Sequence, residues 1–209
     1  MVSCFEGWRT LTMQVLPFLG LHLNDAPSAR LGRAGEAGRQ QILRDMADTV
    51  DLLYNCVSLG LWVPFNEGWG QFSALEVTDR LRAMDPTRPI DHASGWHDQG
   101  GGDLKSRHVY YRPVRLKNDG RRVLALTEFG GYSLQCPGHL ATDKKFGYRM
   151  YDDTAAWMDA VEKLYETEVL PLIQAQGLSA AVYTQLSDVE DEVNGLVTFD
   201  RRVCKMDPA

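Results

Sequence analysis

Two glutamates occupy the same kind of position in this chain, at the end of an apolar run and with a glycine one or two residues later. Glu67 follows residues 59–65, and Glu128 follows residues 123–127. Apolar runs of this length are typical of strands that are buried on both faces of a parallel sheet. Barrel enzymes keep their chemistry at the C-terminal ends of such strands. The two carboxylates are therefore expected at the same end of one sheet.

Hydrolysis of a glycosidic bond with retention of configuration requires at least two carboxylates that face one cavity. At about 5.5 Å and an effective dielectric constant near 20, they repel by roughly 3 kcal/mol, or about two pKa units. One can therefore keep its proton for the leaving group while the other attacks the anomeric carbon. The alternative is that both are ordinary glutamates at helix entries or in salt bridges, which is the commoner role of any single glutamate.

Hydrophobic periodicity predicts alternating helices and strands that could position these carboxylates. The predicted elements are a helix over 37–53, a strand over 59–65, a helix opened by a capping box at Ser73–Glu76, strands over 90–94, 107–111 and 123–127, a helix over 153–173 and a strand over 178–186. Pro171 is expected to kink or end the long helix. Residues 112–122 are too few for a crossover helix and are expected to form a loop. Repeated strand and crossover units of this kind predict an α/β fold with a parallel sheet.

The chain resembles glycoside hydrolase family 2, which includes β-galactosidases, β-glucuronidases and β-mannosidases. The matching stretches are Pro-Phe-Asn-Glu-Gly-Trp-Gly-Gln-Phe at 64–72, Asp-Pro-Thr-Arg-Pro at 85–89, Ala-Ser-Gly-Trp at 93–96, His-Val-Tyr at 108–110 and Thr-Glu-Phe-Gly-Gly at 127–131. The resemblance implies a partial (β/α)8 TIM barrel that contains strands 4–8, with strands 1–3 absent. Residues 1–36 would then be an irregular remnant of the strand 3 to helix 3 region, and 37–209 the partial catalytic domain.

The resemblance also implies roles for individual residues. Glu67 is expected to be the general acid and base, and Glu128 the nucleophile. Asn66 would hydrogen-bond the 2-hydroxyl of the sugar, a contact that strengthens in the transition state. Tyr110 would donate a hydrogen bond to Glu128 and keep that carboxylate ionised.

Several aromatic residues and histidines are further candidates for substrate binding. Trp69 and Trp96 come just after strand ends, where they could stack on a sugar ring or pack one loop on another. His108 could bind sugar hydroxyls, whereas for His92 a place in the core is at least as good an interpretation. Tyr183 is predicted to contact substrate, but many family members carry tryptophan at that position, so the floor of the sugar site stays open.

Composition excludes several other classes of function. A net charge of −6 and no basic run with interleaved aromatics argue against a nucleic-acid partner. No apolar stretch approaches the roughly 18–20 residues that span a bilayer, so no membrane partner is expected. Four widely spaced cysteines favour reduced thiols over a zinc site. The acidic residues at 188–192 favour a solvated loop over a cation site, so no metal and no cofactor are expected.

The sequence therefore predicts a retaining β-glycosidase, similar to β-galactosidases, that hydrolyses the bond to a terminal β-linked sugar. The alternative is an inactive truncated fragment or a subunit, which would act only with a companion chain or as a carbohydrate-binding piece. Open strand edges predict self-association or a companion chain that completes the barrel. The chain is expected to stop within the last barrel helix, after Met206. Its first residues lack the pattern of a signal peptide, which leaves the location open with the cytoplasm as default.

Overall fold

The computed structural model describes residues 16–17, 19, 21–27, 31, 33–144 and 146–206. They form two compact units, the first from residues 1–107 with 119–123, and the second from residues 108–118 with 124–209. Most of the predicted irregular segment 1–36, and the residues after Met206, lie outside the described residues. Within the described part of the chain, no helix is both long and apolar enough to cross a membrane.

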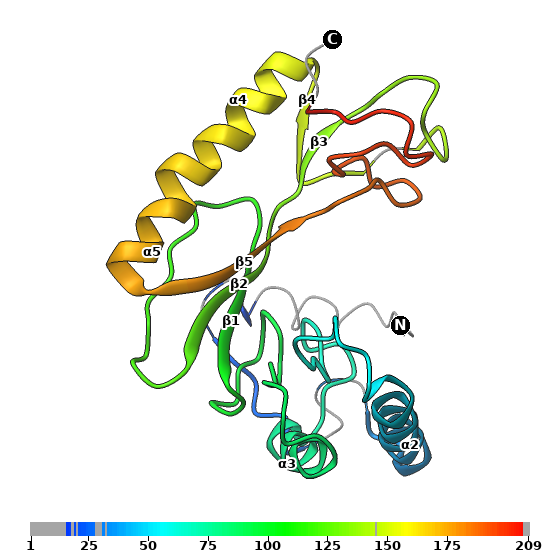
Figure 1. The fold of residues 1–209 in the computed structure, drawn as a ribbon, viewed down its shortest axis with the longest axis vertical. Coiled ribbons are helices and arrows are strands. Elements are labelled where there is room, and N and C mark those ends of the chain that lie inside the picture. Colours follow the sequence, from blue (N-terminus) through cyan, green and yellow to red (C-terminus); the bar gives the residue numbers. More distant parts are fainter. Residues whose placement is uncertain are drawn as a thin grey trace. The chain divides into compact units, whose positions relative to one another are not determined.

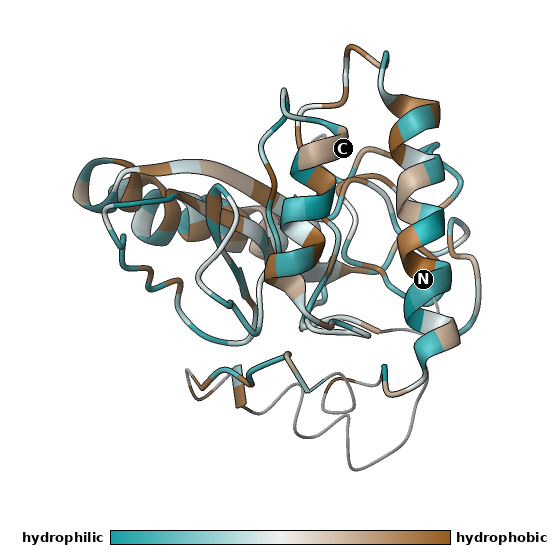
Figure 2. Cartoon of the chain, turned by 90° about the horizontal axis from the view of Figure 1, so that it is seen from below, coloured by the Kyte–Doolittle hydropathy of each residue, from teal (hydrophilic) through white to brown (hydrophobic). Residues whose placement is uncertain are grey.

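The first unit contains two packed helices, α2 (Glu36–Leu53) and α3 (Ala74–Met84) (Figure 1). The predicted helix over 37–53 is confirmed. Hydrophobic and hydrophilic bands alternate along the helices in Figure 2, as expected where one face of a helix is covered. Val50 of α2 and Leu81 of α3 share a buried cluster with Trp62 and Ile90. That cluster holds the helices against the segment that leads to Glu67.

The start of α3 differs from the sequence prediction. Ser73 makes no capping hydrogen bond with its side chain. Its backbone is left-handed, with φ of 39°, whereas a serine that caps a helix normally has an extended backbone. Asp25 supplies the cap instead, because its Oδ2 atom accepts hydrogen bonds from Ala74 N at 2.9 Å and from Gln71 Nε2 at 2.8 Å. The predicted capping box is therefore wrong.

The predicted strands 59–65 and 90–94 lie side by side and parallel, but they are not continuous strands. The structure has two isolated bridges, Trp62 with Ile90 and Asn66 with Ser94. Pro64 lies between the bridges and has no N–H to donate, which interrupts the ladder. The parallel direction agrees with the prediction, while the length of regular strand does not.

The Asp-Pro-Thr-Arg-Pro stretch has a structural role in the first unit. The buried Asp85 at the end of α3 accepts hydrogen bonds from Thr87, from Trp62 Nε1 at 2.8 Å and from Arg88 at 2.7 Å. These bonds, first of all the one from the Thr87 hydroxyl, hold the pKa of Asp85 well below its usual value. Arg88 also donates to Leu59 O at 2.9 Å. The stretch thereby fixes both ends of the segment that enters the Glu67 turn.

The strands β1 (Leu104–Val109), β2 (Val123–Gly130) and β5 (Leu178–Thr184) form a sheet in that order (Figure 1). Strands β2 and β5 run parallel, as predicted. Two further strands, β3 (Tyr132–Leu134) and β4 (Arg149–Tyr151), form a separate parallel pair. Neither was predicted, because three residues are too few to show a period of two. The mixed α/β fold with parallel pairing is thus confirmed, and the partial barrel stays a prediction.

Residues 112–122 form a loop without a helix, as predicted. The loop is tied to the helical segment of the second unit at two places. Val114 N donates to Glu168 Oε2 at 2.6 Å, and Asn118 Nδ2 donates to Gln176 O at 2.8 Å. Val114 and Leu116 are buried in the same cluster as the apolar residues of β2. The loop therefore covers the sheet where a crossover helix would otherwise pack.

The predicted helix over 153–173 is present in three consecutive parts. They are α4 (Thr154–Leu164), the π-helix η2 (Tyr165–Val169) and α5 (Leu170–Gln176). Asp153 caps α4 by accepting a hydrogen bond from Ala156 N at 2.8 Å. Pro171 does not end the helix. The wider π turn comes directly before it, where a proline ring would otherwise clash with the preceding turn of an α-helix.

Candidate functional site

Glu67 lies in a tight turn of the first unit. Trp69 N donates to Asn66 O at 3.1 Å, and Glu67 and Gly68 have φ values of 52° and 73°. Positive φ at both central positions defines a type I′ turn. Glycine adopts this backbone freely, but glutamate does not. A strained backbone at a carboxylate is typical of a functional position.

Two contacts hold this turn in place. Glu67 N donates to Ser94 O at 2.9 Å, next to the parallel bridge of Asn66 with that serine. A Cβ atom on Gly68 would lie 2.4 Å from His97 Cδ2. Gly68 is therefore needed both for its backbone conformation and for the close approach of the His97 ring.

A cluster of buried polar residues, formed by Gln71, His97 and Asp25, lies next to the Glu67 turn and was not predicted. Gln71 Nε2 donates to His97 O at 3.1 Å as well as to Asp25. His97 Nδ1 accepts from Leu23 N at 3.1 Å, so the ring proton belongs on Nε2. These residues come from three separate stretches of sequence. Only Gln71 carried a signal, through its place in the matching stretch 64–72.

The remaining candidates of the first unit are placed as follows. Trp69 and Trp96 are half-buried, which leaves part of each side chain exposed. His92 is buried, and its Nε2 atom accepts from Gln99 N at 3.0 Å. That environment matches the alternative of a core histidine.

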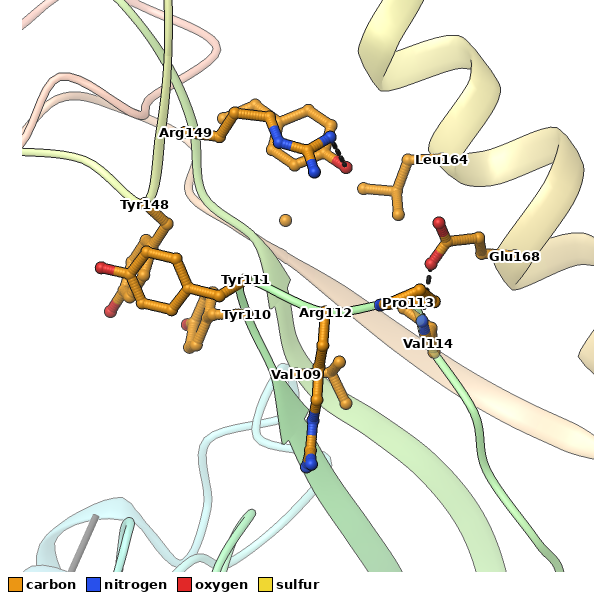
Figure 3. Close-up of a pocket in the computed structure, with 12 residues that line it drawn as sticks. Val109, Tyr110, Tyr111, Arg112, Pro113, Val114, Tyr148, Arg149, Leu164 and Glu168 are labelled. Atoms are coloured by element: carbon orange, nitrogen blue, oxygen red, sulfur yellow. Dashed lines mark hydrogen bonds between the residues drawn. The ribbon is translucent and has the colours of Figure 1, made fainter. Parts of the chain in front are cut away.

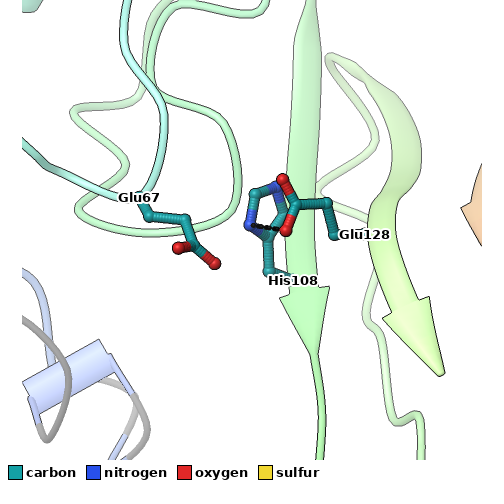
Figure 4. Close-up of side chains that lie close together, drawn as sticks. All are labelled: Glu67, His108 and Glu128. Carbon is teal, nitrogen blue, oxygen red and sulfur yellow. Dashed lines mark ion pairs between the residues drawn. The ribbon is translucent and has the colours of Figure 1, made fainter. Parts of the chain in front are cut away.

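Glu128 of the second unit lies on β2 and is held by side chains. Tyr110 donates its hydroxyl proton to Glu128 Oε2 at 2.7 Å, and His108 Nδ1 lies 3.3 Å from the same oxygen. Figure 4 shows the imidazole of His108 against the carboxylate. The side chain of Glu128 is 29% exposed, whereas that of His108 is fully buried. The hydrogen bond predicted from Tyr110 to Glu128 is therefore present.

Tyr110 is fixed as a hydrogen-bond donor. Its hydroxyl also lies 2.9 Å from Thr184 Oγ1. Burial, and then the negative charge of Glu128, raise the pKa of Tyr110 far above its ordinary value. The phenol is therefore protonated at neutral pH and donates a hydrogen bond to the carboxylate.

The alternation of side chains along β2 and β5 separates the site from the core. Tyr183 is paired with Phe129, one residue away from Glu128 along the strand. Its ring packs edge to face on Phe129 at 5.6 Å, and its hydroxyl accepts from Tyr132 N at 3.2 Å. Burial raises the pKa of Tyr183 well above its ordinary value. The half-buried Tyr183 thus packs against the core, and this geometry gives no support to its predicted contact with a sugar.

The two glycines after Glu128 allow two tyrosines to approach the backbone. A Cβ atom on Gly130 would lie 2.3 Å from Tyr183 Cε2, and one on Gly131 would lie 2.2 Å from Tyr148 Cδ2. Both glycines have positive φ. Tyr148 stacks on Tyr110 with ring centroids 3.9 Å apart and planes at 5°. Tyr148 was not predicted, since its role depends on a contact 17 residues from the motif.

The acidic segment at 188–192 differs from the predicted solvated loop. Asp188 is buried and pairs with the buried Lys205, whose Nζ lies 2.7 Å from Asp188 Oδ1. Lys205 also donates to Leu134 O at 2.8 Å and Val193 O at 3.0 Å. Lys205 thereby links Asp188 to Leu134 of β3.

No protein-family model matches the chain, and no curated protein matches it. Among solved structures, the chain is similar to the β-glucuronidase of Faecalibacterium prausnitzii, with a TM-score of 0.53 and 13% sequence identity. The likeness is one of fold. It covers 80% of this chain and 33% of the β-glucuronidase, so the chain spans about a third of the length of that protein. The fold thus resembles part of a glycoside hydrolase.

Proposed function

We propose that this chain carries the catalytic carboxylates of a retaining β-glycosidase of the family 2 type, which releases a terminal β-linked sugar. The observation that carries the proposal is the setting of Glu128. A partly exposed carboxylate near the end of a parallel strand accepts a short hydrogen bond from a tyrosine whose pKa is raised by burial. Likeness in fold to a β-glucuronidase supports the same class of reaction.

Glu128 is the proposed nucleophile. Its Oε2 atom accepts the hydrogen bond from Tyr110 and lies 3.3 Å from His108 Nδ1, which holds the carboxylate for attack on the anomeric carbon. A hydrogen bond to the charged form favours that form, so the Tyr110 hydroxyl keeps the carboxylate ionised before attack. Attack breaks the glycosidic bond, forms a glycosyl ester on Glu128 and removes its charge.

Glu67 is the proposed acid and base. It gives its proton to the leaving oxygen in the first step and takes a proton from water in the second. We expect the carboxyl groups of Glu67 and Glu128 to lie roughly 5–5.5 Å apart, as retention requires. The rigid type I′ turn would keep Glu67 in place, and Asn66 would bind the 2-hydroxyl. Trp69, Trp96 and His108 are the proposed contacts to the rest of the sugar.

Substrates with leaving groups of different pKa test these roles. Aryl β-galactosides, β-glucosides and β-glucuronides are the first compounds to assay, because the sugar itself is not fixed by the residues above. Glu67→Gln should slow substrates with poor leaving groups far more than activated aryl glycosides, which need little protonation. Glu128→Gln should abolish turnover of all of them. Exchanged behaviour of the two variants would contradict the roles, and full activity of either would contradict the site.

A second candidate function is that of a subunit that works only with a companion chain. The observation that favours it is the open edge of strand β5. Among the described strands it pairs with β2 alone, and its residues from Ser179 to Val182 are exposed on both faces. Such an edge is a template for another strand. Sedimentation of the chain, combined with turnover assays, separates the candidates, because a stable and active monomer would exclude the second.

A further inference from the structure

The second unit contains a small pocket of about 60 Å³ that no step above uses. It lies beside Tyr110, and three tyrosines gather at one side of it while Leu164 and Glu168 lie on the helix opposite (Figure 3). Two arginines, Arg112 and Arg149, also line it.

The pocket owes its shape to the loop that replaces a crossover helix. Val114 N donates to Glu168 Oε2, which ties the loop to the π-helix η2. Tyr111, three residues earlier, has a φ of 58°, and Arg112 N donates to Tyr110 O at 2.7 Å across it. A tyrosine rarely adopts this backbone, and a strained position of this kind points to a function.

The strain at Tyr111 exposes an aromatic surface. Tyr111 is 66% exposed and Phe146 is 43% exposed, and both rings meet Tyr148 edge to face, at 5.1 Å and 5.6 Å. Tyr148 in turn stacks on Tyr110, whose hydroxyl is bonded to Glu128. The aromatic surface is therefore continuous, through one ring, with the proposed nucleophile.

We propose that Tyr111, Tyr148 and Phe146 form a stacking subsite for saccharide units beyond the sugar that is cleaved off. The apolar C–H face of a pyranose ring packs on exposed aromatic side chains such as Tyr111 and Phe146. This inference rests on the proposed function for its choice of ligand. It makes the enzyme a processor of oligosaccharides rather than of simple glycosides.

Binding to the full chain tests the subsite without any need for turnover. The probes are cellotetraose and β-1,4-linked galactotetraose, with saturation-transfer NMR as the readout. Tyr111→Ala and Phe146→Ala should each weaken binding about three- to tenfold, the scale of one aromatic contact. The matched control is Phe199→Ala, since Phe199 is a comparably exposed aromatic of the same unit, 39% exposed and outside the pocket. Its binding should equal that of the unchanged chain.

Kinetics separate a failure of the subsite from a failure of the proposed function. In an active preparation, Tyr111→Ala should lower kcat/KM for a tetrasaccharide three- to tenfold and leave kcat/KM for a β-glycosyl fluoride, whose leaving group has no ring to stack, unchanged. Binding that depends on Tyr111, without any turnover, would sink the catalytic proposal and retain the subsite. No saccharide binding, or equal losses in Tyr111→Ala and Phe199→Ala, would overturn the subsite.

Discussion

The two glutamates are held in place by different means. Glu67 lies on a tight turn whose conformation is set by the backbone, with Ser94 O as its anchor and Gly68 packed on His97. Glu128 lies on a regular strand and is held by the side chains of Tyr110 and His108. The contacts described for Glu67 fix its main chain, whereas those described for Glu128 fix its carboxylate. Different substitutions are therefore expected to disturb the two glutamates.

The largest effect is expected from removal of the hydroxyl group that holds Glu128. Tyr110→Phe should lower kcat/KM by on the order of 10²-fold, the usual cost of one lost donor at a charged oxygen. Loss of a hydrogen bond to the ionised form also raises the pKa of Glu128, so the acidic limb of the pH profile should move to higher pH. Thr184→Val is the control, because it removes the other partner of Tyr110 and leaves the bond to Glu128. If the acidic limb of the pH profile is unchanged in Tyr110→Phe, the Tyr110 hydroxyl does not hold the Glu128 carboxylate in its ionised form.

Glycine substitutions in both units should separate close packing from backbone strain. Gly131→Ala must displace Tyr148, and Gly68→Ala must displace His97. Gly138 and Gly100 have positive φ with open space around them and serve as the controls. We expect the controls to lose about 1 kcal/mol of unfolding free energy, and the two packed glycines about 2–3 kcal/mol. Denaturant unfolding measures these losses. Equal losses for Gly131 and its control Gly138, and for Gly68 and its control Gly100, would contradict the role of close packing.

Asp25 should matter more than the serine that directly precedes α3. Asp25→Ala removes the cap of α3 and the partner of Gln71, which should cost about 1–2 kcal/mol of unfolding free energy. Ser73→Ala should cost little, since Ser73 makes no capping bond. Thermal unfolding of the two variants checks the difference. A larger loss in Ser73→Ala would restore the cap that the sequence predicts.

The smallest effect concerns the strain at Glu67. Glu67→Asn should raise the unfolding free energy by about 0.5 kcal/mol, because Asn followed by Gly suits a type I′ turn. The same change at position 128, Glu128→Asn, should lower it by a similar amount, because asparagine is disfavoured in strands. Both variants should be inactive. Destabilisation by Glu67→Asn would show that the turn is not strained.

The sequence predicts those parts of this fold whose signals are long and local. The predicted helix over 37–53 carries enough residues to show a period, and the predicted strand over 123–127 is a clear apolar run; both are confirmed, within α2 and β2. The three-residue strands β3 and β4 are too short to show one. The break at Pro64 was in principle readable, because proline cannot donate to a ladder.

The candidate site shows the same division between local and distant signals. The hydrogen bond from Tyr110 to Glu128 was predicted from a matching motif and is present. The cap supplied by Asp25 lies 49 residues from Ala74 in the sequence, and the stacking of Tyr148 depends on the missing side chain of Gly131. Contacts of this kind arise only when separate segments of the chain pack together, so no local sequence pattern predicts them.

Covalent trapping tests the central claim most directly. A 2-deoxy-2-fluoro β-glycoside with a good leaving group should form a glycosyl ester and then react with water only slowly, because fluorine destabilises the transition state of the second step. Peptide mass spectrometry should then find the sugar on Glu128, and Tyr110→Phe should acquire the label more slowly. A label on Glu67 or on any other residue, or turnover with inversion of the anomeric carbon, would contradict the account.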